Sequence, residues 1–236
     1  MEQELTLKIT NVLADPTRYS IYQYVSNNHR NVSVQDIAEE FHIHPNVARL
    51  HLSKLEDVGM LRSENQKTGK GGRPSRLYRL SDEVVELNFP FRDYRLLAKI
   101  ALETMVCLGP AASNALYETG KRYGLEIMGN LLVKRNINKD QLSFNQKVEL
   151  LKTSSSMLGL NPDIYIKEDN HKLFFQIFNC PFKEVASQQK DITCDLHIAF
   201  LKGLVEALFD NPFILTNVQN MMDGCLSCAY HLNISN

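Results

Sequence analysis

The stretch "HPNVARLHLSKLEDVG", residues 44–59, carries the pattern that decides the fold of the first third of the chain. Ala48, Leu52 and Leu55 recur at i, i+4 and i+7, which is the spacing of an apolar stripe along one face of a helix. Gly59 is suited to ending that helix. When the apolar stripe packs inward, the opposite face presents Asn46, Arg49, Leu50, Ser53 and Lys54.

Two helix-start signals precede this stretch, and a hairpin pattern follows it. Asp15-Pro16 places an N-cap residue before a proline at the first helical position. "SVQD", residues 33–36, has the spacing of a capping box, with Asp where Glu or Gln is usual. After Gly59, "MLRSEN" and "SRLYRL" alternate like strands and are joined by the glycine-rich "QKTGKGG". The order helix, short helix, turn, helix, hairpin predicts a winged helix-turn-helix domain over residues 1–85.

The outward face of the 44–59 helix has the residue types that read DNA. An outward Arg and an outward Asn can reach guanine and adenine edges in the major groove. We therefore expect Arg49 and Asn46 to contact bases and Lys54 to contact a phosphate, with Ser53 on the same face. The alternative is an ordinary solvated helix face, because charge is common on any helix. His51 lies at the edge of the apolar stripe, where we expect a packing or backbone-bonding role.

The hairpin concentrates positive charge in a chain whose net charge is only −1. Six basic residues lie between positions 62 and 79 against one acid, Glu64, and phosphate neutralisation requires such clustering. "GGRPSR" resembles the core of a minor-groove hook, in which glycine lets the backbone approach and arginine enters the narrow groove. The DNA contacts expected from this hairpin are Lys67, Lys70, Arg73 and Arg76.

Three segments of this region together resemble a known family. "ADPTRYSIYQYV", "HPNVARLHLSKLEDVGML" and "TGKGGRPSRLYRLS" are similar to the winged-helix repressors of the broad ArsR/DeoR-type group. The resemblance covers the first third of the chain. It implies a homodimer that binds double-stranded operator DNA at inverted repeats.

The bulk properties limit the remaining function classes. The chain has 236 residues, 44% of them hydrophobic and 22% charged, which is typical of a globular protein with a real core. "MEQELTLKIT" lacks the apolar run of a secretory signal, and no stretch reaches the ~18 uninterrupted apolar residues of a membrane span. We therefore expect a cytoplasmic protein without a membrane partner. In that compartment, grouped cysteines indicate metal or redox chemistry more often than disulfides.

The rest of the chain predicts central helices followed by a small α+β domain. Apolar residues repeat at helical spacing over residues 86–140, and they fit a dimer interface, a connecting bundle or an intramolecular core equally well. "SFNQ", residues 143–146, is a capping box that opens a further helix. The order hairpin, helix, hairpin then predicts an α+β sensor domain over residues 141–236, with its last turn at Asp223-Gly224. The fold class expected for the whole chain is therefore α+β.

Four of the five cysteines lie in this last segment and are candidate metal ligands. Strand end, helix start and turn can converge at one end of a small domain, where four thiolates would hold zinc or an iron–sulfur cluster. We expect the helix start to favour thiolate at Cys194, because unpaired amides there stabilise negative charge. The candidates are Cys180, Cys194, Cys225 and Cys228.

Other interpretations of the cysteines remain open. Thioredoxin-like redox chemistry fits poorly, because the CxxC pair has strand-like sequence after it rather than a helix. Structural zinc is a serious alternative, and so is simple burial, which is our expectation for Cys107 inside an apolar helix. His197 and His231 each follow a cysteine by three residues and permit mixed sites, although a structural role is expected for both.

A second resemblance covers this region. "NCPFKEVASQQKDITC" followed by "DGCLSCAYHL" is similar to the C-terminal domain of the repressors of iron–sulfur assembly operons, the SufR-like family. In that family three cysteines hold a cluster, and their positions match Cys180, Cys194 and Cys228 here. Cys225 departs from the pattern, so it supplies a fourth thiolate or shifts the preference from cluster to zinc.

The combined expectation is a regulator rather than an enzyme. The sequence has no paired acid/base set, phosphate loop or nucleophile constellation. We expect a cytoplasmic, dimeric, DNA-binding repressor that senses iron–sulfur or redox status through a [4Fe-4S] or [2Fe-2S] cluster. The alternatives are a winged-helix regulator with a structural or sensing zinc site, and one with a small apolar effector pocket and merely buried cysteines.

Overall fold

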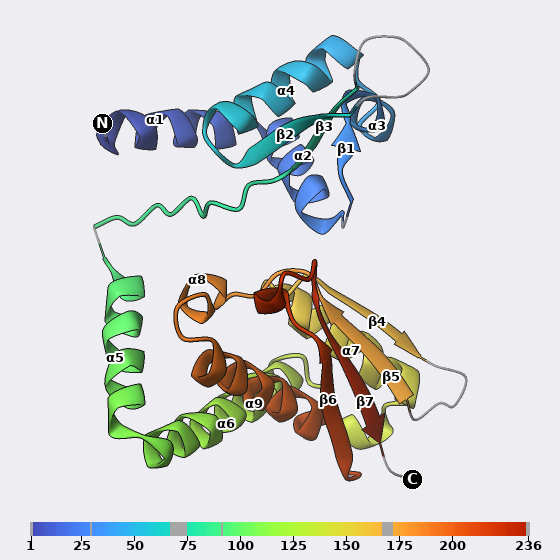
Figure 1. Ribbon diagram of the computed structural model, residues 1–236. Coiled ribbons are helices and arrows are strands. Elements are labelled where there is room, and N and C mark those ends of the chain that lie inside the picture. The colour runs from blue at the N-terminus through green and yellow to red at the C-terminus, as the bar shows by residue number, and fades with distance from the viewer. Residues whose placement is uncertain (1, 29, 67–74, 91, 167–171, 235–236) are drawn as a thin grey trace. The chain divides into compact units, whose positions relative to one another are not determined.

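The structure is a computed structural model. It describes residues 2–28, 30–66, 75–90, 92–166 and 172–234. The chain divides into two compact units, residues 1–92 and 93–236 (Figure 1). The elements of the first unit are α1 (Glu2–Leu13), α2 (Pro16–Asn27), β1 (Val32–Ser33), α3 (Val34–Glu40), α4 (Pro45–Asp57), β2 (Leu61–Gln66) and β3 (Ser75–Leu80). The elements of the second unit are α5 (Tyr94–Leu108), α6 (Pro110–Lys134), η1 (Lys139–Gln141), α7 (Phe144–Met157), β4 (Pro162–Ile166), β5 (Lys172–Ile177), α8 (Lys183–Ala186), α9 (Lys190–Leu208), β6 (Phe213–Gln219), η2 (Met221–Asp223) and β7 (Cys228–Ile234).

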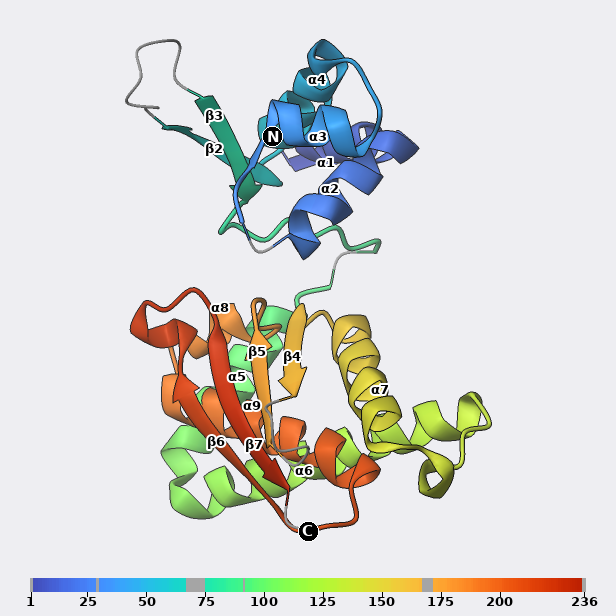
Figure 2. The same cartoon turned by 90° about the vertical axis from the view of Figure 1, so that its right-hand side faces the viewer.

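Local capping residues position the helices of the first unit. The Asp15 carboxylate accepts a hydrogen bond from the Arg18 amide at 3.0 Å, and Pro16 follows at the first helical position of α2. Ser33 and Asp36 form both bonds of a capping box at the start of α3, as predicted. Strands β2 and β3 pair antiparallel (Figure 2), and β1 pairs with the other edge of β3, which gives the order β1-β3-β2. This arrangement is a winged helix-turn-helix.

The predicted helical phase of α4 is confirmed. Ala48, Leu52 and Leu55 are completely buried and contact the core made by α1, α2, α3 and β3. Gly59, just beyond α4, has a φ of +74°, a left-handed conformation that glycine adopts without steric cost. The polar face of α4 is therefore fixed outward by the burial of the opposite face.

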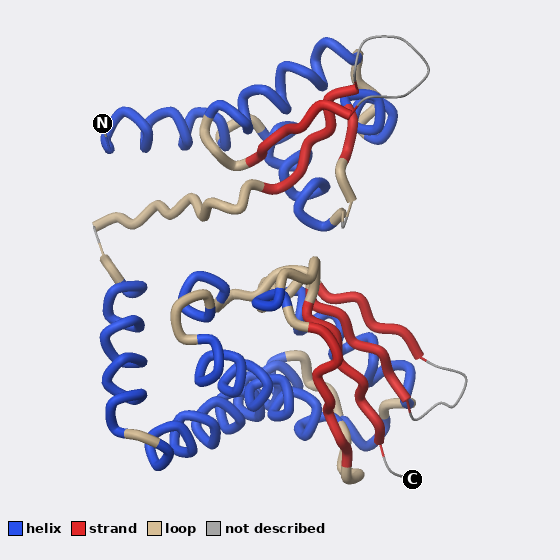
Figure 3. Tube along the Cα trace, viewed as in Figure 1, coloured by secondary structure: helices blue, strands red, loops and turns tan. Residues whose placement is uncertain are grey.

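The second unit packs helices on one face of a four-stranded antiparallel sheet of order β4-β5-β7-β6 (Figure 3). Alternate residues of β5, namely Leu173, Phe175 and Ile177, are buried against apolar side chains of α6, α7 and α9. Ser143 and Gln146 form the capping box that starts α7, as predicted. The "EDNH" turn expected between β4 and β5 lies outside the described residues.

Helices α6 and α9 cross at backbone contact, and glycines permit the approach. A Cβ atom on Gly124 would lie 2.1 Å from the Phe200 carbonyl oxygen, and one on Gly203 would lie 2.1 Å from the Lys121 carbonyl oxygen. Both distances are far shorter than any van der Waals contact, so neither position accepts a side chain while the helices stay in place. The close contact with α6 holds α9 in place against the sheet.

Helix α6, which lies in the predicted segment 86–140, packs along α9 within the second unit. One expectation for this region is corrected by the structure. Cys107 is exposed rather than packed, because no residue of α5 is buried. Within the described part of the chain, no helix is long and apolar enough to cross a membrane.

Candidate functional site

The exposed face of α4 is the first candidate site. Asn46, Arg49 and Lys54 are exposed and Ser53 is half-buried, while Leu50 keeps 54% of its surface exposed. The Arg49 guanidinium donates a long hydrogen bond of 3.4 Å to the Asn46 side-chain oxygen, so the two predicted base-reading side chains lie together on the first turns of the helix. A helix in the major groove contacts base edges with residues in this region.

His51 takes the packing role expected for it. Its side chain is buried, and its Nδ1 lies 4.0 Å from an Asp15 carboxylate oxygen, too long for a hydrogen bond. Burial lowers the pKa of His51, and the nearby Asp15 carboxylate only partly offsets this. His51 is therefore a neutral group between α4 and the start of α2.

The hairpin uses part of its positive charge internally. Arg76, which we expect to contact DNA, donates to the Glu56 carboxylate at 2.7 Å and to the Ser63 hydroxyl at 2.6 Å. Arg62 and Arg79 both pair with Asp82. Arg76 thus joins β3 to the end of α4 and β2, which orients the wing. The predicted contacts Lys67, Lys70 and Arg73 lie outside the described residues.

The second candidate site is a small cavity in the second unit, lined by three of the four predicted cysteines. Cys180 follows β5, Cys194 lies on α9, and Cys228 begins β7. The cavity has a volume of about 10 Å³, close to the least that holds one water molecule. Its lining residues are Cys180, Ala186, Thr193, Cys194, His197, Asn220, Met222, Cys228 and Tyr230.

Asn220 and the imidazole of His197 contact the sulfur atoms. The Asn220 amide group donates to the Cys194 sulfur at 3.6 Å, and the Asn220 oxygen lies 3.8 Å from the Cys228 sulfur. The Met221 amide donates to the Cys228 sulfur at 3.4 Å. On the other side, the Cys180 sulfur lies 3.7 Å from Nδ1 of His197. Asn220, which also caps η2, therefore positions two of the cysteines.

Burial favours the neutral form of four groups that line the cavity. Burial raises the pKa of the Cys180 thiol to about 11 and raises the pKa of Cys228 as well. Burial also lowers the pKa of His197 to about 4, and it raises the pKa of Tyr230. Thiolates are disfavoured in such surroundings without a cation, which supplies the opposite charge and binds only the deprotonated form.

Two buried polar atoms of the lining have no hydrogen-bond partner among the described residues, Oγ1 of Thr193 and Nε2 of His197. Burying a polar group without a partner costs about 1–3 kcal/mol, so such atoms call for an explanation. Their position beside three thiols fits a bound soft metal, for which thiolate and imidazole are suitable ligands. A single ion matches the cavity volume, whereas a cluster requires the surrounding segments to move outward.

The donor groups are not arranged as a finished metal site. Among the residues that the structure describes, no three Cys, His, Asp or Glu side chains are placed to bind one ion. The lining side chains must therefore turn toward a common point when a metal binds.

The expected placement of two cysteines differs from the structure. Cys225 does not line the cavity, because it lies on the connection between η2 and β7. Cys194 is the fifth residue of α9 rather than its first, so it lies beyond the unpaired amides of the helix start. His197, for which a structural role is expected, also lines the cavity. Cys194 and His197 are three residues apart on one helix, and this spacing in the sequence predicts that they lie on the same face.

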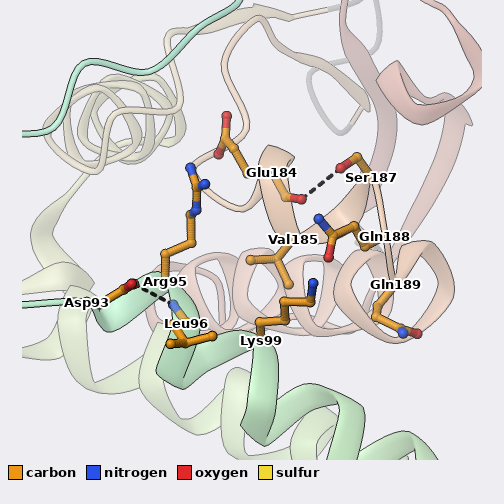
Figure 4. Close-up of a pocket in the computed structure, with 9 residues that line it drawn as sticks. All are labelled: Asp93, Arg95, Leu96, Lys99, Glu184, Val185, Ser187, Gln188 and Gln189. Atoms are coloured by element: carbon orange, nitrogen blue, oxygen red, sulfur yellow. Dashed lines mark hydrogen bonds between the residues drawn. The ribbon is translucent and has the colours of Figure 1, made fainter.

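A larger groove lies beside the segment that joins Cys180 to Cys194 (Figure 4). Its volume is about 450 Å³, and it is formed by the first turns of α5 and by residues 184–189. Arg95 extends toward Glu184 across it, while Lys99 and Asp93 line the side made by α5 (Figure 4). Because its lining is charged and open, it does not have the character of an apolar effector pocket. Helix α5 therefore lies beside the segment that joins Cys180 and Cys194.

Comparisons with known proteins support the first site. A profile described as a helix-turn-helix domain matches residues 13–64, which contain α2, α3 and α4. This match supports a winged helix-turn-helix regulator that binds DNA. No curated protein sequence matches the chain.

Solved structures show only distant likeness. A trafficking protein particle complex subunit 3 from Naegleria fowleri, covalently bound to palmitic acid, is 11% identical, covering 61% of this chain and 95% of its own, with a TM-score of 0.47. The phenol-responsive sensory domain of the transcription activator PoxR is 16% identical, with coverages of 79% and 89% and a TM-score of 0.44. An H-NOX protein from S. oneidensis is 13% identical, with coverages of 67% and 84% and a TM-score of 0.39. All three scores are below 0.5, so nothing about this chain is inferred from these likenesses.

Proposed function

We propose that the protein is a transcriptional repressor that binds operator DNA as a homodimer and is governed by a metal centre in the second unit. The observation that carries the proposal is the meeting of Cys180, Cys194 and Cys228 around one cavity that also holds unpartnered polar atoms. These are the three positions at which the SufR-like resemblance implies an iron–sulfur cluster, and a cluster is accordingly the first candidate.

A zinc ion is the second candidate, and two observations favour it. The cavity of about 10 Å³ has room for a single ion rather than for a cluster. The lining also includes the His197 imidazole, and zinc commonly combines thiolate with imidazole ligands. In this form the protein is a zinc-dependent regulator with the same DNA-binding surface.

In this proposal, gain or loss of the metal centre changes DNA affinity by shifting the population between two conformations of the protein. Gain or loss of the centre favours one arrangement of the segment between Cys180 and Cys194, and that segment lines a groove with α5. Helix α5 is the first element of the second unit after the winged helix. A ligand changes DNA affinity only by its differential affinity for the two arrangements, so the coupling is measurable from either side.

The direct test is the metal content of the full chain purified without oxygen. We expect brown protein that contains iron and acid-labile sulfide, and operator affinity that differs between the loaded and the stripped forms by about fivefold or more. Colourless protein with one zinc per chain selects the second candidate. Protein with neither metal, whose operator affinity is unchanged by added iron and sulfide or by zinc, contradicts the proposal.

For the DNA surface, Arg49→Ala is expected to reduce discrimination between operator and random DNA by about 1–3 kcal/mol, since a base contact is lost. Arg73→Ala is the charge-matched comparison. It is expected to weaken binding to both DNAs equally. The slope of log affinity against log salt concentration should also fall by about one, because one phosphate contact is lost. Fluorescence anisotropy at several salt concentrations measures both effects. Equal losses of discrimination in the two variants would show that α4 does not read bases.

A further inference from the structure

We infer that His197 is the non-thiolate ligand of the metal centre, completing the set begun by Cys180, Cys194 and Cys228. The inference rests on the proposed function and adds to it the identity of the fourth protein ligand. It departs from the four-cysteine set that the sequence predicts, in which Cys225 takes that place.

The first line of support is position. His197 is 3% exposed, and it lines the same cavity as the three cysteines. It lies one turn beyond Cys194 on α9, so both side chains project from one face of the helix. The Cys180 sulfur lies 3.7 Å from Nδ1 of His197. Two ligands of one tetrahedral zinc ion, with bonds of about 2.3 Å to sulfur and about 2.0 Å to nitrogen, lie roughly 3.5 Å apart.

The second line of support is that His197 has no competing partner. Its Nε2 is buried without a hydrogen-bond partner among the described residues. The ring packs at 86° against Phe182, with the ring centroids 5.4 Å apart, and its Nδ1 faces the Cys180 sulfur, which is itself one of the inferred ligands. The aromatic edge of Phe182 therefore holds the imidazole beside the Cys180 sulfur, where it can bind a metal once the lining side chains turn toward a common point.

His231 is the matched control within the chain. It follows Cys228 by three residues, as His197 follows Cys194, but it lies on β7 and does not line the cavity. On a strand, residues three apart point to opposite faces, and His231 instead packs against Phe174 at 5.6 Å between ring centroids. The same sequence spacing therefore gives a shared site on α9 and no shared site on β7.

The experiment uses full-length protein with ¹⁵N-labelled histidine, purified without oxygen. When the protein holds an iron–sulfur cluster, pulsed electron paramagnetic resonance of the reduced form is expected to show a directly bound histidine nitrogen that shifts on labelling. When it holds zinc, X-ray absorption is expected to show three sulfurs and one nitrogen. His197→Ala should lose this nitrogen signal and retain metal more than about tenfold less well against a chelator, while His231→Ala should keep both.

The outcomes separate this inference from the proposed function. Metal-loaded wild-type protein without a bound histidine nitrogen overturns the role of His197 and leaves the regulator proposal in place. Retention of the nitrogen signal in His197→Ala also overturns it. Protein that holds neither iron nor zinc removes the proposed function and this inference together. Because the first measurement is made on wild-type protein, a folding defect in a variant does not affect it. His197→Cys should restore metal retention without the nitrogen signal.

Discussion

Gly124→Ala is expected to destabilise the second unit by about 3 kcal/mol, at the upper end of the usual cost of overpacking. The added Cβ would lie 2.1 Å from the Phe200 carbonyl oxygen and 3.0 Å from the Leu204 backbone nitrogen. These are backbone atoms, so no side chain can turn away and α6 must move off α9. The buried residues Met128 on α6 and Leu204 on α9 then lose contact within the core.

Gly129→Ala is the control for this prediction. Gly129 lies on the same helix, and a Cβ there meets no atom within 4 Å. The same chemical change should therefore stabilise the protein by about 0.5–1 kcal/mol, because glycine inside a helix loses more backbone entropy than alanine. Urea unfolding followed by far-ultraviolet circular dichroism measures both variants. Equal stability of the two variants would contradict the close crossing of α6 and α9.

Cys228→Ser is expected to reduce the metal content to less than about a tenth of the wild-type value, since a serine hydroxyl does not replace a thiolate ligand. Cys228 is 5% exposed; its sulfur accepts a hydrogen bond from the Met221 amide, and its thiol donates to the side-chain oxygen of Asn220. The near-isosteric serine keeps the shape of the cavity, so loss of metal reports on the ligand rather than on packing. Operator binding should then no longer respond to iron and sulfide or to zinc.

Cys225→Ser and Cys107→Ser are the controls for the cysteine prediction. Cys225 does not line the cavity, and Cys107 is exposed on α5, so both variants should keep the wild-type metal content. Metal analysis by mass spectrometry, with the sulfide assay, compares all three variants. A loss in Cys225→Ser as large as that in Cys228→Ser would restore the four-cysteine set, and full metal content in Cys228→Ser would show that the cavity is not the site.

Much of the first unit follows from local sequence. The cap at Asp15, the capping box at Ser33 and the phase of Ala48, Leu52 and Leu55 are all as predicted. Each of these features depends on residues within one or two helical turns, where hydrogen bonding and burial act directly on neighbours. The internal use of Arg76 was not predictable in this way, because its partner Glu56 lies 20 positions away on another element.

The glycine contact between α6 and α9 had a sequence signal of low specificity. Gly120 and Gly124 are four residues apart and therefore lie on one face of α6. Small residues at that spacing permit a close helix approach, but they name no partner. Gly203, the partner on α9, is 79 positions beyond Gly124, and only the packed unit brings the two glycines together.

By itself, the sequence determined the winged helix, the outward face of α4 and the presence of a cysteine-rich α+β segment. A resemblance implied that Cys180, Cys194 and Cys228 belong together, but only the tertiary structure brings them around one cavity. The pairing of Ile177 with Cys228 across β5 and β7 brings Cys180, three residues beyond Ile177, toward Cys228. The close contact between α6 and α9 holds in place the helix that carries Cys194 and His197. Strand register and helix crossing depend on the whole core, so the short CxxC spacing could not reveal that Cys225 lies outside the cavity.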